Sequence, residues 1–361
     1  SVHAFANDPE RGIYLLWILA AFIGGSLTLY AWRAPALRSD AVFAVVSRES
    51  GLVVNNLLLV TATLVVFFGT MWPLAAEVLT GRKVSVGPPF FDLAFTPFMV
   101  ALAVVLPPFA ILPWKRGSLS RAMAQLRAPL ALAVALGALV FALGTGRSML
   151  APVGAALAAW LILGALADLA GRVRLGQAGA REALRRARNL PRADWGKALA
   201  HAGFGVTIWG IAAITAWAVE DIRAVRAGES FEVAGYELRF DGEVDARGPN
   251  YTIQRGTVTV FRGGREIGTL HPEKRVYEVQ GMATTEAGID RGLTRDLYVA
   301  LGDRQADGAW ALRTYVKPFS NWIWAGAMLM ALGGIASLTD RRYRVGAPAR
   351  RTAAPSALPA E

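Results

Sequence analysis

The chain has 361 residues, of which 54% are hydrophobic and 18% are charged, and its mean hydropathy is +0.38. A chain this apolar, with runs long enough to cross a bilayer, is typical of an integral membrane protein and not of an ordinary globular enzyme. The net charge of +11 lies mostly in short loops between apolar runs, where membrane-insertion bias explains it better than nucleic-acid binding does. The absence of cysteine excludes disulfides, thiolate metal sites, cysteine nucleophiles and a covalent C-x-x-C-H haem site within this chain.

Seven apolar runs are long enough to span a membrane, and basic residues gather in the loops after the first, third and fifth of them and in the tail. The runs lie at about residues 12–32, 51–78, 93–114, 128–145, 149–170, 198–219 and 319–338. The positive-inside rule places the basic loops in the cytoplasm, so we expect the N-terminus outside and the C-terminus inside.

This topology predicts five segments along the chain. They are an outer-face N-terminal segment (1–11), a six-helix transmembrane region (12–219), an extracytoplasmic β-rich domain (220–318), a last transmembrane helix (319–338) and a cytoplasmic basic tail (339–361). The expected fold class is therefore a polytopic α-helical membrane protein with one extracytoplasmic antiparallel β domain.

The β domain is predicted from alternating apolar and polar residues, which indicate strands with one buried face. Such alternation occurs at Phe231–Val233, Tyr236–Phe240, Tyr251–Gln254 and Thr257–Phe261, and further strands are expected at Ile267–Leu270, Leu297–Leu301 and Trp310–Val316. Gly263 and Gly264 form a plausible hairpin turn, whereas residues 272–296 look less regular. We expect a small antiparallel barrel or sandwich.

The three histidines of the chain are the candidate metal or proton-transfer residues. His3 precedes the first helix on the outer side, and His201 is expected in the first turn or two of the sixth crossing, in the inner leaflet. The two cannot ligate one iron, because a bilayer core of about 30 Å separates them. His271 precedes a proline and is interpreted as exposed loop.

Small residues beside His201 allow two interpretations. Gly205 and Ile208 follow it by four and seven residues on the same helical stripe, so an imidazole there could face a flat apolar niche that suits a porphyrin. The same glycine could instead let two helices approach closely. The local sequence does not choose between these.

The remaining sequence features are less informative about function than the histidines. The sequence has no G-x-x-x-x-G-K-[ST] loop, no H-E-x-x-H helix and no G-x-S-x-G elbow, so nucleotide hydrolysis and common hydrolytic mechanisms lack support. Asn55 and Asn56 lie inside the second run, where they either hydrogen-bond across the helix bundle or line a polar cavity.

Several tracts occur in a characteristic order along the chain. They are Ser1–Ala6, Val46–Ser50, Asn55–Asn56, Ser85–Phe91, Ala200–Gly203, Pro272–Tyr277, Thr285–Ala287, Arg295–Gly302, Lys317–Phe319, Trp322–Trp324 and Asp340–Tyr343. In these tracts the chain resembles the C-terminal half of the cytochrome c maturation haem lyase family, CcmF/NrfE, and the resemblance covers nearly all of it.

The resemblance implies a role in thioether attachment of haem to C-x-x-C-H motifs of apocytochrome c, at the outer face of the bacterial cytoplasmic membrane. It implies that His3 ligates the haem being transferred and that His201 is one transmembrane ligand of a haem b. It assigns no catalytic residue. Implied partners are apocytochrome c, a haem chaperone and other maturation subunits. Arg82, Lys83, Lys274 and Arg275 are only charge-compatible with the haem propionates.

The chain departs from the family pattern in ways that bear on both haem sites. A tryptophan-rich segment of the W-G-x-W-W-x-W-D type, a second outer histidine and a second membrane histidine are absent from these 361 residues. Each site is then half built, so we expect either a separate N-terminal haem-lyase polypeptide as partner or a longer parent protein.

Two alternative functions remain at this point. The chain could be a non-catalytic assembly subunit that docks apocytochrome or a haem chaperone on residues 220–318. A small-solute transporter is the weaker alternative, because no inverted repeat and no chain of intramembrane carboxylates is seen.

Overall fold

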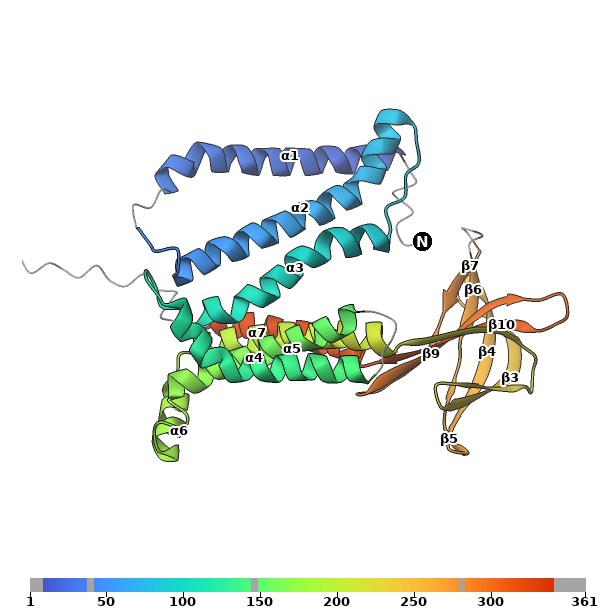
Figure 1. Ribbon diagram of the computed structural model, residues 1–361. Coiled ribbons are helices and arrows are strands. Elements are labelled where there is room, and N and C mark those ends of the chain that lie inside the picture. Colours follow the sequence, from blue (N-terminus) through green and yellow to red (C-terminus); the bar gives the residue numbers. More distant parts are fainter. Residues whose placement is uncertain (1–8, 38–41, 144–148, 279–280, 282, 341–361) are drawn as a thin grey trace, which may run out of the picture. The chain divides into compact units, whose positions relative to one another are not determined.

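The computed structural model describes residues 9–37, 42–143, 149–278, 281 and 283–340 (Figure 1). The chain divides after Leu126 into two compact units, which are described in turn. Among the described residues, seven helices are long and apolar enough to cross a membrane. This confirms the predicted polytopic membrane protein.

The first unit consists of long apolar helices. They are α1 (Pro9–Arg33), the short 3-10 helix η2 (Ala34–Leu37), α2 (Arg48–Thr80), α3 (Pro88–Ile111) and the first turns of α4 (Leu119–Ala142). The Ser47 side chain accepts a hydrogen bond from Ser50 N and begins α2, and Gly81 ends it with a φ of 68°.

Polar contacts join the start of α2 to the end of α3 and the loop that follows it. Arg48 Nε donates to Leu112 O at 3.0 Å, and Lys115 N donates to Glu49 Oε2 at 2.8 Å. Within α2, Asn55 Nδ2 donates to Asn56 Oδ1 at 3.2 Å, so part of the asparagine pair's hydrogen bonding is satisfied locally.

The second unit holds the rest of α4, then α5 (Leu150–Val173), α6 (Ala180–Asn189), α7 (Arg192–Trp217) and α8 (Asn321–Leu338). The helix α6 corrects the expectation that the basic stretch between the fifth and sixth crossings is all loop. Glu182 stabilises it through Arg185 Nη2 at 2.6 Å and Arg186 Nε at 2.8 Å, which are contacts that only helical spacing allows.

Helices α7 and α8 pack closely along a line of glycines. Gly196, Gly203 and Gly210 recur every seven residues on α7 and face α8, on which Gly326 and Gly333 have the same spacing. A Cβ atom added to Gly203 would lie 2.7 Å from Gly326 O, and one added to Gly333 would lie 2.5 Å from Gly196 O. The two backbones are therefore nearly in contact, as small-residue motifs permit in membranes.

Between α7 and α8 the chain folds into a sandwich of two antiparallel sheets (Figure 1). One sheet has the order β1-β10-β9-β8, and the other has the order β2-β3-β4-β6-β7 with β5 paired to β4. The strands are β1 (Val219–Val225), β2 (Ser230–Val233), β3 (Tyr236–Arg247), β4 (Tyr251–Arg262), β5 (Arg265–Leu270), β6 (Glu273–Tyr277), β7 (Ala283–Glu286), β8 (Gly288–Arg291), β9 (Arg295–Arg304) and β10 (Trp310–Pro318).

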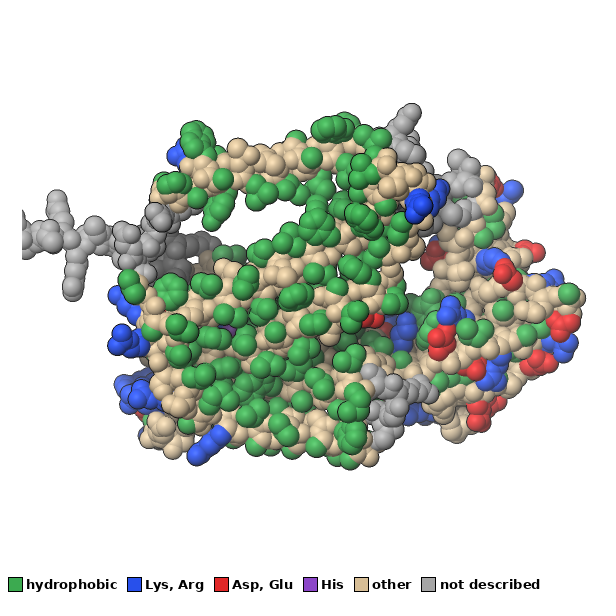
Figure 2. All heavy atoms as spheres, turned by 45° about the horizontal axis from the view of Figure 1, so that its top comes forward, with side chains coloured by type: hydrophobic (Ala, Val, Ile, Leu, Met, Phe, Trp, Pro, Cys, Tyr) green, Lys and Arg blue, Asp and Glu red, His purple; other side chains and the backbone are tan. Residues whose placement is uncertain are grey.

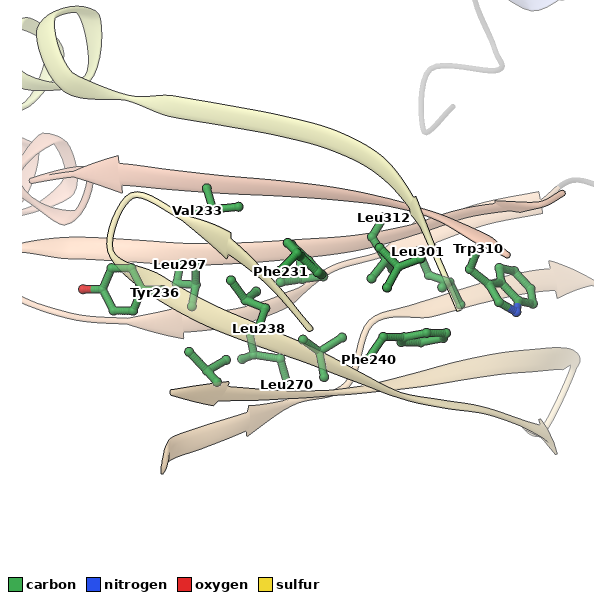
Figure 3. Packing of buried hydrophobic residues seen from close by; sticks show 14 of the residues in the cluster. Phe231, Val233, Tyr236, Leu238, Phe240, Leu270, Leu297, Leu301, Trp310 and Leu312 are labelled. Carbon is green, nitrogen blue, oxygen red and sulfur yellow. The ribbon is translucent and has the colours of Figure 1, made fainter. Parts of the chain in front are cut away.

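The sandwich core is built from the alternating apolar residues of both sheets (Figure 3). Leu238 and Phe240 of β3 meet Leu297 and Leu301 of β9, and Trp310 lies in the same cluster. Leu238, Phe240, Leu297 and Leu301 have no exposed surface. The predicted antiparallel domain is thus confirmed, and of the two expected architectures it is the sandwich.

Three expectations about the strands need correction. The two predicted strands Tyr251–Gln254 and Thr257–Phe261 are one strand, β4, and the first strand of the domain, β1 (Val219–Val225), was not among those predicted. The stretch 272–296, expected to be irregular, holds β6, β7 and β8. The predicted hairpin turn is confirmed, because Gly263 and Gly264 join β4 to β5 with φ values of 58° and 76°.

Side-chain type differs sharply between the helices and the sandwich (Figure 2). On the face shown, hydrophobic side chains cover much of the helices and Lys and Arg side chains lie at helix ends, whereas acidic and basic side chains both gather over the strands. An apolar exterior is what lipid contact requires, and a charged one is typical of a surface in water.

Candidate functional site

His201 lies in the third turn of α7 and is half-buried. It was expected in the first turn or two, but the helix begins at Arg192, six residues before the predicted start. The early turns contain Arg192, Asp194 and Lys197, whose charges lower the local hydropathy although the backbone is helical. The side chain therefore sits deeper along the helix than the apolar run suggested.

The helix presents His201 on the face turned away from α8. At about 100° per residue, His201 is roughly 160° around the helix from Gly203, which packs on α8. Gly205 lies on the same side as His201 and packs on α5, where an added Cβ atom would meet Ala158 O at 2.8 Å and Leu161 Cβ at 3.1 Å. Gly205 therefore allows the close approach of α7 and α5 that the second interpretation expected.

A buried ion cluster lies next to His201. Asp168 of α5 is 6% exposed, and its Oδ2 is 2.6 Å from Lys197 Nζ on α7, one turn before His201. Arg172 of α5 bridges Asp168 Oδ1 at 3.1 Å and Asp194 Oδ1 at 3.0 Å. Two carboxylates and two cations thus compensate each other and fix the register of α5 against α7.

Sequence reasoning missed this cluster, although a signal was present. Asp168 is an acidic residue inside a predicted membrane crossing, and such a residue needs a partner. Asp168 and Lys197 are both near enough to act on the His201 ring electrostatically.

The imidazole itself is chemically available. The structure gives neither ring nitrogen of His201 a hydrogen-bond partner among the described residues. An imidazole on a membrane-spanning helix, with no hydrogen-bond partner among the described residues, is chemically able to bind haem iron. The donor set is incomplete in the described part of the chain, where no group of three or more His, Cys, Asp or Glu side chains comes together.

Of the other two histidines, only His271 lies among the described residues. His3 lies outside the described residues. His271 is exposed between β5 and β6 and has no regular secondary structure, as expected for loop.

The four basic residues considered for haem propionates differ in their surroundings. Lys274 pairs with Asp303, and Arg275 Nη2 lies 2.6 Å from Glu273 Oε2. Lys83 lies 3.8 Å from Glu77 and is largely exposed, and Arg82 is exposed in the turn after α2. The charges of Lys274 and Arg275 are therefore already compensated within the sandwich, which weakens their case as propionate ligands.

Comparison with known proteins identifies relatives of the whole chain, including the helix that carries His201. The family description "CcmF C-terminal beta-sandwich" matches residues 216–318. The cytochrome c-type biogenesis protein ccl1 of Rhodobacter capsulatus is 54% identical over 361 residues, covering 100% of this chain and 54% of that protein. CcmF of Escherichia coli is 39% identical over 354 residues, covering 98% and 53%. NrfE of Haemophilus influenzae is 30% identical over 354 residues, covering 95% and 52%.

The chain is similar over nearly its whole length to proteins of the CcmF/NrfE family. A solved structure of "Cytochrome c Heme Lyase CcmF" matches it with a TM-score of 0.64 and 22% identity, covering 82% of this chain and 46% of that one, which supports the fold. The chain spans about half the length of the curated CcmF and NrfE relatives it matches. The family resemblance found in the sequence is confirmed.

Proposed function

We propose that this chain is part of a cytochrome c haem lyase and assists thioether attachment of haem to apocytochrome c C-x-x-C-H motifs. The observation that carries the proposal is the membrane-embedded His201, held by the packing of α5, α7 and α8 in a chain whose relatives are cytochrome c biogenesis proteins. Thioether formation adds each cysteine S–H across a haem vinyl group, so it needs positioning of the two partners and a suitable iron oxidation state.

His201 is proposed to hold the iron of a haem b, which would supply one-electron chemistry when bound. The Asp168–Lys197–Arg172–Asp194 cluster holds α5 against α7 and so fixes the position of the imidazole. His3 is proposed to ligate the haem being transferred on the outer face. The second ligand of each iron would come from an N-terminal haem-lyase part, which is the proposed partner along with apocytochrome c, a haem chaperone and other maturation subunits.

The proposed location is the bacterial cytoplasmic membrane, with residues 220–318 outside and the tail from residue 339 inside. Basic residues support this orientation, because they concentrate around α6 and in the loops on the same predicted side. In this orientation the sandwich and His3 share the compartment in which apocytochrome c would be met.

The test is a substitution of His201 in the chain coexpressed with an N-terminal haem-lyase polypeptide. His201→Ala is expected to reduce the low-spin haem absorbance of the purified assembly at least tenfold and to reduce the yield of holocytochrome c. His201→Met is expected to restore binding with a raised reduction potential, because thioether ligation favours ferrous iron. His271→Ala is the matched control and should leave the spectrum and the yield unchanged.

An unchanged spectrum and yield in His201→Ala would contradict the haem assignment. A different outcome favours the non-catalytic docking subunit: the haem spectrum is lost, but holocytochrome c yield is kept. The docking function is supported by the sandwich, which is compact and has a hydrophobic core of its own.

A further inference from the structure

A cavity of about 500 Å³ lies where the sandwich joins the last membrane helix. Its walls come from β8, β9, β10 and the first turns of α8, and include Ile289, Arg291, Tyr298, Lys317, Asn321 and Trp324. None of these residues belongs to the His201 site.

Hydrogen bonds fix the walls of this cavity. Asn321 Nδ2, at the start of α8, donates to Asp296 Oδ1 at 2.8 Å and to Gly292 O at 2.9 Å. Trp322 Nε1 donates to Leu293 O at 2.8 Å. The turn between β8 and β9 is thereby attached to the helix, so the cavity is a built feature of the fold.

The cavity has an excess of positive charge. Arg291 and Lys317 have no carboxylate within 4.0 Å among the described residues, unlike Lys274 and Arg275 elsewhere on the sandwich. The one acidic residue of the lining, Asp296, already accepts hydrogen bonds from Asn321 and from Gly292 N. Two cations against one carboxylate leave a net charge of about +1, which favours an anion.

Aromatic side chains hold one of these cations in place. Lys317 Nζ lies 4.7 Å from the ring centroid of Tyr315 and 5.2 Å from that of Tyr298. Cation–π contacts orient the ammonium group, and the Glu220 carboxylate of β1 lies near enough to act on it electrostatically without forming a direct ion pair among the described residues. Lys317 therefore keeps its N–H donors available to a ligand anion.

The apolar part of the lining lies at the level where a membrane begins. Helix α8 is a membrane span that begins at Asn321, and Trp322 and Trp324 occupy its first turn. Trp324 is 72% exposed and Ile289 is 40% exposed. Tryptophan at the end of a span marks the headgroup region, so a ligand here meets cations at one end and an apolar surface at the other.

We propose that this cavity binds the phosphate group of an anionic phospholipid, with Arg291 and Lys317 facing the phosphate and Ile289 and Trp324 facing its glycerol and acyl groups. The lipid would fix the sandwich against the membrane surface at the start of α8. The proposal depends on α8 as a membrane span and is independent of the haem assignment.

Native mass spectrometry of the full chain, titrated with phosphatidylglycerol or phosphatidylcholine, tests the proposal. The wild-type chain should retain phosphatidylglycerol at least tenfold better than phosphatidylcholine. Lys317→Gln or Arg291→Gln should weaken phosphatidylglycerol binding about fivefold each, and the double variant about twentyfold, because each cation near a membrane surface contributes about that factor. Arg265→Gln, which removes an exposed arginine of β5, is the control and should bind as the wild type does.

Equal retention of the two lipids, or a double variant that binds like Arg265→Gln, would overturn the proposal. Displacement of phosphatidylglycerol by haemin but not by added anionic lipid would assign the cavity to porphyrin carboxylates and would also overturn it. Size-exclusion profiles and far-UV circular dichroism of the variants establish that the sandwich remains folded.

Discussion

Glu273 shows how one residue of a family motif stabilises the sandwich. It is 8% exposed on β6, and its carboxylate lies 2.7 Å from Arg255 Nε and 2.6 Å from Arg275 Nη2. Burial raises the pKa of this carboxyl. The hydrogen bonds and charges of Arg275 and Arg255 lower the pKa by more than burial raises it, so the pKa lies below its ordinary value. A lowered folded-state pKa means that the ionised carboxylate stabilises the fold, and that this contribution is lost in acid.

Glu273→Gln is therefore expected to lower the local free energy of unfolding of β4 and β6 by about 1–2 kcal/mol at pH 7. The value is modest because the Arg255 side chain is 44% exposed and solvent screens the pair. The difference from wild type should shrink as the pH falls below the ordinary carboxyl pKa of 4.5 and should vanish below the folded-state pKa. Hydrogen exchange of β4 and β6 peptides, measured by mass spectrometry and corrected for intrinsic rates, gives this difference in the local free energy of unfolding.

Glu266→Gln is the control for this experiment, because Glu266 is an exposed residue of β5 without an ion pair among the described residues. A destabilisation by Glu273→Gln that persists unchanged at pH 3 would show that shape, and not charge, explains the role of Glu273.

At the residue scale, the sequence singled out His201 as a candidate ligand but carried little information about the side chains around it. His201 could be singled out because histidine is rare here and its chemistry is specific. The packing of Gly205 on α5 and the pairing of Asp168 with Lys197 could not be predicted, because both depend on which helix faces which. Hydropathy identifies membrane helices but carries little information about their mutual rotation.

At the scale of elements, the close contact between α7 and α8 lets us predict how a substitution in it changes stability. Gly333→Ala would place a Cβ atom 2.5 Å from Gly196 O and 2.7 Å from Ala200 N, both backbone atoms that cannot move independently. We expect a loss of about 1–3 kcal/mol, as for other overpacked contacts, and a melting temperature lower by several degrees. Thermal unfolding of the detergent-solubilised chain, followed by light scattering and tryptophan fluorescence, measures it.

The neighbouring Gly334 provides a matched control, because a Cβ atom added there has no heavy atom within 4 Å. Gly334→Ala should leave the melting temperature unchanged or raise it slightly, since alanine favours a helix over glycine by up to about 1 kcal/mol. Equal effects of the two substitutions would mean that the close approach of α7 and α8 contributes nothing to stability.

The elements missed from the sequence share a physical cause. Strands β7 and β8 have four residues each, and the alternation of buried and exposed side chains in β6 is weak, so a period of two was not visible there. Helix α6 was missed because its arginines resemble a loop that follows the positive-inside rule. The longer β3, β9 and β10 alternate clearly, because their apolar residues fill the sandwich core.

At the scale of the whole molecule, the proposed function depends on which side of the membrane each part of the chain occupies. The chain covers 54% of the Rhodobacter relative and contains one described membrane histidine. In the proposal made above, the second ligand of each haem iron comes from another part of the assembly, and orientation decides which compartment each site meets. The region around α6 is strongly basic, which the positive-inside rule favours on the cytoplasmic side.

Because the chain has no cysteine, single cysteines can report this orientation without a cysteine-free background having to be made. Arg265→Cys on β5 and Arg188→Cys on α6 both replace exposed side chains. With residues 220–318 outside, a membrane-impermeant maleimide should label Arg265→Cys in intact spheroplasts, and should label Arg188→Cys only after permeabilisation. Labelling of Arg188→Cys in intact spheroplasts, with Arg265→Cys protected, would reverse the proposed topology. It would also place the sandwich in the cytoplasm, away from the compartment where the proposed haem attachment takes place.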